Sequence, residues 1–311
     1  MKQLTCEMCG STDLLKQDGV FVCQTCGTKY SVEEAKKMMI EGTVQVEGTV
    51  KTKESDFVIR AGVLEKYNGE STKVIIPDSV KKIKTQAFEG LPIAEIVFPD
   101  DYPSVDMYAC ASVKEHLKSV IIGNGTTSID YCSFKEFTNL ISVILGNNIK
   151  NIGNSAFKGC TSLRNITIPN GVTSIADYAF SGCSSLASIK IPSSVTSIGL
   201  RAFEGCSSLT SITIPDSVTS IDACAFVCCT GLTSITIPDS VTSIGQYAFA
   251  DCKNLKSVVI PKGASIGINV FNCCSKLEPT KLICESYSNT KIPKSSTFSN
   301  CGFVEKGYCA N

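Results

Sequence analysis

The sequence lacks several features that would assign it directly to a large functional class. It has a single histidine, His116, which excludes multi-histidine metal sites and leaves one candidate for histidine-based acid–base chemistry. Its 29 lysines and arginines are balanced by 29 aspartates and glutamates, so a basic excess for tracking nucleic-acid phosphates is missing. No run approaches the roughly 18 consecutive apolar residues of a membrane span, and the N-terminus MKQLTCEMCG has no apolar signal core. We therefore expect a cytoplasmic protein without a membrane span and without a dedicated nucleic-acid role.

What the sequence does contain is apolar residues and cysteine. Apolar residues make up 43% of the 311 residues and charged residues 19%, a balance typical of a globular chain with a large core. The length predicts about two structural units, at roughly 150 residues per domain. The 18 cysteines are about 6% of the chain, below the roughly 8–10% of short disulfide scaffolds. Because the cytosol keeps thiols reduced, disulfides are not expected to account for so many cysteines. Their positions in the sequence have to indicate their roles instead.

Two copies of a CxxCG pattern lie within the first 30 residues. CEMCG contains Cys6 and Cys9, and CQTCG contains Cys23 and Cys26, with 13 residues between the two pairs. Two residues between cysteines let a tight turn direct both sulfurs at one ion, and the following glycine permits a positive φ. The intervening LLKQDGVFV predicts two short strands around an Asp-Gly turn. We predict one structural zinc ion per chain, bound by these four cysteines, which supplies most of the folding energy of so small a module.

Residues 3–30 resemble the zinc-ribbon family, including the ribbon of transcription factor IIB. The paired knuckles are also similar to those of rubredoxins, which hold iron but separate their knuckles by a longer insert. Two disulfides are the other alternative, and a thioredoxin-type role lacks its βαβ context. The resemblance suggests nucleic-acid binding, but residues 1–40 carry five lysines against five acids, and zinc held by four thiolates adds a formal charge of −2. We therefore favour a structural or protein-docking ribbon.

The ribbon is followed by a predicted helix and a linker. Ser31 and Glu34 fit a capping box that opens a short helix to about Ile40, so residues 1–40 are predicted to form the zinc ribbon plus this helix. Residues 41–55, EGTVQVEGTVKTKES, alternate valine with polar residues between two glycines. This composition predicts a linker with β tendency, either a flexible tether or a docked edge hairpin.

From residue 134 the chain repeats itself every 23 residues. Each unit reads AFxGCxSLxSIxIPxSVTSIG, in which LxSIxI alternates as a strand, the proline ends that strand, and VTSI predicts a second short extended piece. The AFxGC segment predicts a tight turn or short helix. Such strict periodicity predicts a solenoid. The columns are Phe134, Phe157, Phe180, Phe203, Phe226 and Phe249; Cys160, Cys183, Cys206, Cys229 and Cys252; Leu140, Leu163, Leu186, Leu209, Leu232 and Leu255; and Pro169, Pro192, Pro215, Pro238 and Pro261.

The repeats extend backward from this array. Strand segments at 117–123, 96–99 and 74–77 continue the pattern, although the units near 100–116 depart from it. We therefore assign residues 74–279 to the repeats and residues 56–73 to an N-terminal cap that covers the open end of the core. Residues 280–311 are predicted to be a degenerate repeat or a C-terminal cap, with TFSNC at 297–301 as the closing layer.

The unit AFxxCxxLxxIxIPxxVxxIG resembles the BspA-like leucine-rich repeat family over about residues 57–278. The resemblance implies a mainly β fold with short helical turns, a leucine-rich-repeat solenoid of about nine 23-residue units preceded by the small zinc-ribbon domain. Members of this family are commonly surface or secreted proteins implicated in adhesion and protein binding. Because this chain shows no signal peptide or cell-wall sorting signal, an adhesin-like cell-surface role is an alternative here.

The repeated polar and cysteine columns are interpreted as structural. A cysteine in each coil beside phenylalanine and leucine predicts a buried layer of reduced thiols, because parallel inward side chains lack the facing geometry of a disulfide. The serine and threonine columns are expected to hydrogen bond between coils. His116 is expected on the surface, and Asp216 and Asp239 have no second carboxylate at a defined facing position. We therefore expect no enzymatic activity.

The clearest functional indication is the outward position of the repeat strand. In leucine-rich repeats, side chains between the two inward strand residues point outward, and partners often use this face. The position changes from apolar to mostly polar along the array: Ile75, Val97, Ile121, Ile144, Thr167, Lys190, Thr213, Thr236 and Val259. We predict that the first four form an apolar surface that receives a protein partner or is covered by the ribbon, its helix or the linker. The predicted role is a non-enzymatic protein–protein interaction scaffold, with a regulatory nucleic-acid binder using the ribbon as another alternative.

Overall fold

The structure of the chain is a computed structural model. It describes residues 52–261 and 263–277 in full, and the backbone of four further strands at 14–17, 20–23, 29–31 and 282–284. The chain divides into two compact units between Lys51 and Thr52. This division falls inside the segment 41–55 that the sequence predicts as a linker, and residues 52–55 belong to the second unit.

The first unit contains a small antiparallel sheet. Its strands are β1 (Leu14–Gln17), β2 (Val20–Cys23) and β3 (Lys29–Ser31), in the order β1-β2-β3. Gln17 pairs with Val20 and Leu14 with Cys23, so the two strands predicted around the Asp-Gly turn are confirmed. The predicted helix to Ile40 lies outside the described residues.

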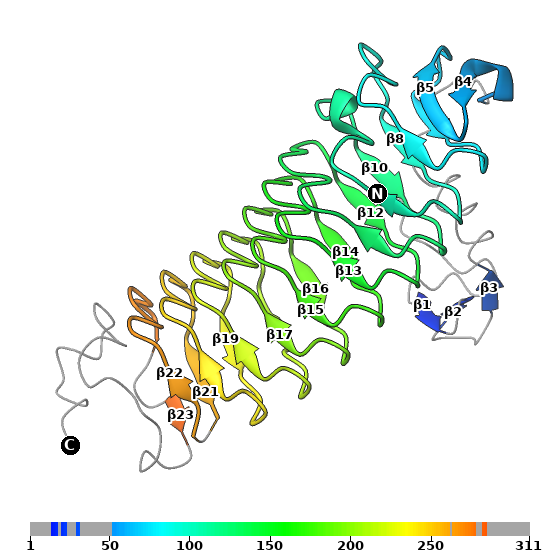
Figure 1. The fold of residues 1–311 in the computed structure, drawn as a ribbon. Coiled ribbons are helices and arrows are strands. Elements are labelled where there is room, and N and C mark those ends of the chain that lie inside the picture. Colours follow the sequence, from blue (N-terminus) through cyan, green and yellow to red (C-terminus); the bar gives the residue numbers. More distant parts are fainter. Residues whose placement is uncertain are drawn as a thin grey trace. The chain divides into compact units, whose positions relative to one another are not determined.

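Nearly every coil of the second unit contributes one strand to a main ladder of parallel strands, and successive coils lie side by side (Figure 1). The first six strands form one sheet, and the next coil adds only the isolated bridge between Lys190 and Thr213. The ladder resumes in the order β19-β21-β23. The strands are β6 (Lys73–Ile75), β8 (Glu95–Val97), β10 (Ser119–Ile121), β12 (Ser142–Ile144), β14 (Asn165–Thr167), β16 (Ser188–Lys190), β19 (Ser234–Thr236), β21 (Ser257–Ile260) and β23 (Leu282–Cys284).

A second parallel ladder consists of two-residue strands, at the position of the predicted VTSI extension, and its strand pairing is interrupted between β7 and β9 and between β13 and β15. Each of these strands is short because the chain enters the tight turn of the AFxGC segment soon after it. Apart from two 3₁₀ helices, η1 (Glu54–Asp56) and η2 (Ala111–Val113), the described residues form no helix. The strands are β7 (Lys82–Ile83), β9 (Ser104–Val105), β11 (Ser128–Ile129), β13 (Asn151–Ile152), β15 (Ser174–Ile175), β17 (Ser197–Ile198), β18 (Ser220–Ile221), β20 (Ser243–Ile244) and β22 (Ser265–Ile266).

A hairpin precedes the first coil. Strands β4 (Phe57–Arg60) and β5 (Val63–Tyr67) pair antiparallel, and β5 pairs parallel with β7. Phe57, Leu64 and Tyr67 are buried. The hairpin therefore continues the second ladder and covers the apolar end of the first coil. At the other end, β23 pairs with β21 and adds a further layer, whereas the predicted closing turn at 297–301 lies outside the described residues.

The core consists of the predicted columns stacked coil upon coil. The phenylalanine rings from Phe134 to Phe271 stack almost parallel, with centroids 5.1–5.7 Å apart and interplanar angles of 2–12°. This separation is slightly larger than the 4.7–4.9 Å between neighbouring strands. The leucine column from Leu140 to Leu255 is fully buried in the same cluster. The fold class predicted from the 23-residue period is thus confirmed.

The cysteine column is a buried layer of free thiols, as predicted. Cys160, Cys183, Cys206, Cys229 and Cys252 are buried and free. Each thiol donates to the phenylalanine carbonyl of the preceding coil, as from Cys206 Sγ to Phe180 O at 3.2 Å. Burial raises the pKa of the Cys160 and Cys252 thiols to about 12, so these thiols stay protonated near neutral pH.

Candidate functional site: two outer faces of the coils

The first candidate surface is the outer face of the main ladder. Ile75 pairs in register with Val97, Val97 with Ile121, and Ile121 with Ile144. The structure therefore places the four predicted residues in one row across β6, β8, β10 and β12. We call these four residues the apolar row.

Exposure differs along the apolar row. Ile75 is 51% exposed, and Val97 and Ile144 are half-buried. Ile121 is only 3% exposed, so the prediction that all four side chains are accessible is wrong for this residue. Its strand lies between two others, and the β-branched side chains of Val97 and Ile144 flank it on both sides. Ile141, immediately before β12, is 37% exposed. The sequence analysis missed Ile141 because it precedes the outward strand position.

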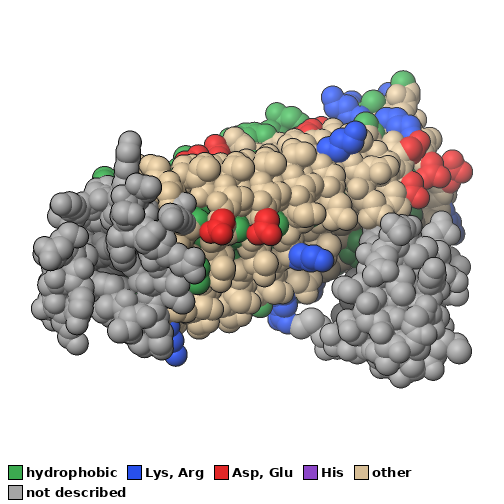
Figure 2. All heavy atoms as spheres, turned by 90° about the horizontal axis from the view of Figure 1, so that it is seen from below, with side chains coloured by type: hydrophobic (Ala, Val, Ile, Leu, Met, Phe, Trp, Pro, Cys, Tyr) green, Lys and Arg blue, Asp and Glu red, His purple; other side chains and the backbone are tan. Residues whose placement is uncertain are grey.

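The later part of the same row is mostly polar, as the sequence predicts, and becomes apolar again at Val259 in β21, which is half-buried. Thr167, Lys190, Thr213 and Thr236 are all exposed. On the face seen in Figure 2, uncharged atoms predominate, and lysines and acids both occur near the N-terminal coils. At that end, Lys73 Nζ and Glu95 Oε1 form an ion pair of 3.0 Å between β6 and β8. The most exposed apolar side chain of this row, Ile75, thus lies among the N-terminal coils, next to charges of both signs.

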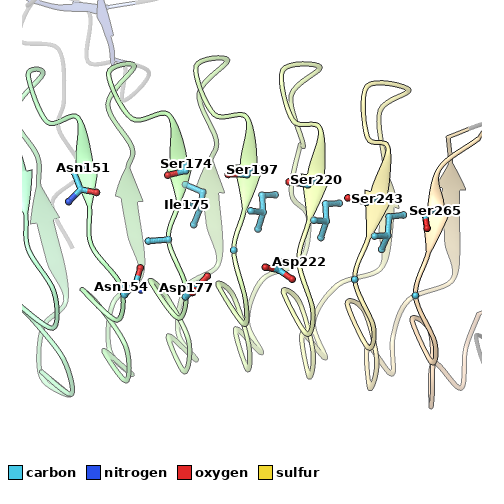
Figure 3. Close-up of a pocket in the computed structure, with 17 residues that line it drawn as sticks. Asn151, Asn154, Ser174, Ile175, Asp177, Ser197, Ser220, Asp222, Ser243 and Ser265 are labelled. Atoms are coloured by element: carbon cyan, nitrogen blue, oxygen red, sulfur yellow. The ribbon is translucent and has the colours of Figure 1, made fainter.

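The second candidate surface is a groove of about 640 Å³ along the second ladder. It extends over β13, β15, β17, β18, β20 and β22, and each coil contributes a short polar side chain (Figure 3). The sequence analysis treated these serines as structural and did not predict the groove. The groove residues used below are Asn151, Asn154, Ser174, Asp177, Ser197, Ser220, Asp222, Ser243, Gly245 and Ser265.

Successive coils approach one another closely at the glycines that line the groove. A Cβ atom on Gly245 would lie 2.3 Å from the backbone nitrogen of Ala223, a contact that excludes any larger residue. The charged side chains that line the groove are Asp177 and Asp222. Asp177 Oδ1 accepts a hydrogen bond from the Leu200 N–H at 2.9 Å, and Asp222 Oδ1 accepts one from the Ala223 N–H at 2.6 Å. Within the described coils, the other oxygen of each carboxylate accepts no hydrogen bond.

The predicted zinc ligands fall almost entirely outside the described residues. Cys6, Cys9 and Cys26 lie there, and Cys23 is described only as the backbone end of β2. The zinc site remains a prediction. Across residues 52–277, position 262 aside, no three histidine, cysteine or acidic side chains gather as a metal site.

His116 is exposed, as predicted. In the part of the chain that the structure describes, no helix is both long and apolar enough to cross a membrane.

Parallel ladders joined by tight turns, with stacked leucine and phenylalanine columns, define a leucine-rich-repeat solenoid. The sequence profile of the BspA type leucine rich repeat region matches the chain over residues 66–187 and 173–305. The chain therefore belongs to the BspA-type leucine-rich repeat family.

Solved structures of other repeat proteins resemble this chain. A leucine-rich repeat protein from Bacteroides ovatus is 30% identical, with a TM-score of 0.56, covering 73% of this chain and 67% of that one. A leucine rich cell surface protein from Faecalibacterium prausnitzii is 25% identical, with a TM-score of 0.44 and coverage of 73% and 87%. A leucine rich repeat protein from T. pallidum is 26% identical, with a TM-score of 0.44 and coverage of 74% and 92%. The search of curated proteins found no match.

Proposed function

We propose that this protein is a non-enzymatic scaffold that binds a protein partner through the apolar row. Leucine-rich-repeat solenoids generally bind proteins, and membership of the BspA-type family supports that role here. The observation that carries the proposal is the change in character along one face. Ile75 is half exposed among the N-terminal coils, whereas the same strand position carries exposed polar residues in the four coils that follow β12. A contiguous exposed apolar patch is typical of a contact surface, and Ile75 with the half-buried Val97 beside it supports one here.

We further propose that the scaffold acts in the cytoplasm and carries one structural zinc ion on Cys6, Cys9, Cys23 and Cys26. The eleven cysteines of the described coils are all free, which supports a reducing compartment. The β1-β2 hairpin supports the ribbon, because it places the residues that follow the first cysteine pair beside the start of the second. When bound, zinc would act only as a structural ion that stabilises the small unit.

The protein-binding proposal is tested by capture from a cell extract with three full-length proteins. The wild type is compared with Ile75→Lys/Ile144→Lys, which places two charges in the apolar row, and with Thr213→Lys/Thr236→Lys, which makes the same change at equivalent positions of later coils. We expect one protein to be recovered by the wild type and by the threonine variant, and to be lost with the isoleucine variant. Recovery by all three proteins, or loss with both variants, would contradict a partner site on the apolar row.

A further inference from the structure

Several columns of hydroxyl side chains tie neighbouring coils together, as the sequence analysis predicts. Thr196 Oγ1 donates to the Thr173 carbonyl at 3.2 Å, and Thr219 Oγ1 donates to the Thr196 carbonyl at 3.2 Å. Ser217 Oγ donates to the Val195 carbonyl at 2.6 Å. These hydroxyls are committed to the fold, since each satisfies a carbonyl of the preceding coil.

The serines of the groove behave differently. Ser174, Ser197, Ser220, Ser243 and Ser265 pair in register along β15, β17, β18, β20 and β22. Within the described coils, their hydroxyls have no hydrogen-bond partner, and they form one row along the groove (Figure 3). Neighbouring strands are about 4.8 Å apart, so the row presents one free hydroxyl per coil over roughly 19 Å.

The charge of the groove restricts the ligand. Asp177 and Asp222 line it, and no lysine or arginine does. A polyanion such as a nucleic acid or an acidic polysaccharide would meet like charge without any compensating cation. The ligand is therefore uncharged or basic.

The strand pairing disfavours an extended peptide. A peptide that adds to a sheet needs a free strand edge with unpaired N–H and C=O groups. Strands β17, β18 and β20 each pair with a neighbour on both sides, so the middle of the groove has no such edge. Recognition must come from side-chain hydroxyl, amide and carboxylate groups.

We propose that this groove binds a neutral, linear polysaccharide, with successive sugars following successive coils. Linked pyranose sugars present hydroxyl groups at a regular repeat close to the coil spacing, and each hydroxyl can both donate to and accept from a serine. At one end, the amide of Asn154 and the amide oxygen of Asn151, whose nitrogen donates to Ser128 Oγ at 3.2 Å, add directional hydrogen bonds. The site uses the second ladder, so it goes beyond the proposed protein-binding function and does not depend on it.

The test is isothermal titration calorimetry of the full-length protein with neutral hexasaccharides of glucose, xylose and mannose, and with an acidic hexasaccharide of galacturonic acid. We expect at least one neutral sugar to bind and the acidic sugar not to bind. Ser197→Ala/Ser220→Ala/Ser243→Ala should weaken that binding at least tenfold, because three hydrogen bonds are lost. The matched control is Ser188→Ala/Ser211→Ala/Ser234→Ala, which removes exposed main-face hydroxyls from the same three coils and should leave binding unchanged.

Three outcomes would overturn the proposal. They are the absence of binding by every neutral hexasaccharide at millimolar concentration, equal weakening by both triple variants, and tighter binding of the acidic sugar. None of these results bears on the apolar row, because the variants that test the protein-binding function lie on the other ladder.

Discussion

The contacts of a buried residue in this fold are made largely with the preceding coil. Cys206 illustrates this, because its buried thiol donates to the Phe180 carbonyl one coil back. We expect Cys206→Ala to lower the free energy of unfolding by about 1–2 kcal/mol, through the lost hydrogen bond and the small cavity left behind. Ser208 is exposed, so Ser208→Ala should change the free energy of unfolding by less than about 0.5 kcal/mol. Chemical denaturation monitored by circular dichroism measures both, and equal stabilities would contradict the stacked thiol layer.

A second residue-level prediction concerns a turn position with positive φ in most coils. Gly205 has φ +68°, and a Cβ there would meet no atom closer than 3.9 Å, so only backbone conformation opposes a larger residue. Gly205→Ala should therefore destabilise the protein by about 1 kcal/mol.

The equivalent position in the next coil is occupied by Cys228, with φ +60° and an exposed side chain. Cys228→Gly relieves this conformation and should stabilise the protein by about 0.5–1 kcal/mol. Thermal unfolding of both variants checks the pair, and the same sign of effect for both would show that the left-handed conformation is not the determining factor.

At the scale of elements, the thiol column predicts a dependence of stability on alkaline pH. Burial raises the pKa of the Cys160 thiol from its ordinary value of 9.0 to about 12. Between these two values the unfolded chain loses this proton while the folded chain keeps it. The contribution to stability is complete below about pH 9 and is lost as the pH rises toward 12, at up to about 1.4 kcal/mol per pH unit for each thiol.

Chemical denaturation at pH 7.5, 9 and 10.5 measures this dependence. The wild type should lose stability steeply above pH 9. Cys160→Ala should lose stability less steeply with rising pH, because the contribution of one buried thiol is missing. Equal slopes for the two proteins would mean that Cys160 titrates alike in the folded and unfolded states.

The sequence predicts the coils well because each 23-residue period places the same residue type in the same environment. The register of Ile75, Val97, Ile121 and Ile144 follows from this spacing alone. The burial of Ile121 does not follow, because exposure depends on what surrounds a side chain in space. The groove was missed for a similar reason. Ser197 and Thr196 are adjacent, but only the geometry shows that Thr196 has a hydrogen-bond partner and Ser197 has none.

At the scale of the whole molecule, the zinc proposal predicts that the two units depend on metal differently. Purified protein should contain one zinc ion per chain by elemental analysis. Cys23→Ser should lose the zinc and the folded first unit, because a module of this size depends on its metal. The β-rich circular dichroism of the coils should remain, since they have their own continuous core. Full zinc content in Cys23→Ser would refute the ligand assignment.

The central claim is that the apolar row contacts a protein partner, and site-specific photocrosslinking in living cells tests it most directly. A photoreactive amino acid replaces Ile75 in one full-length protein and Thr236 in another, since both side chains are exposed at equivalent strand positions. The account predicts a discrete crosslinked protein adduct from position 75 and none from position 236. No adduct from position 75, or the same adducts from both positions, would contradict it.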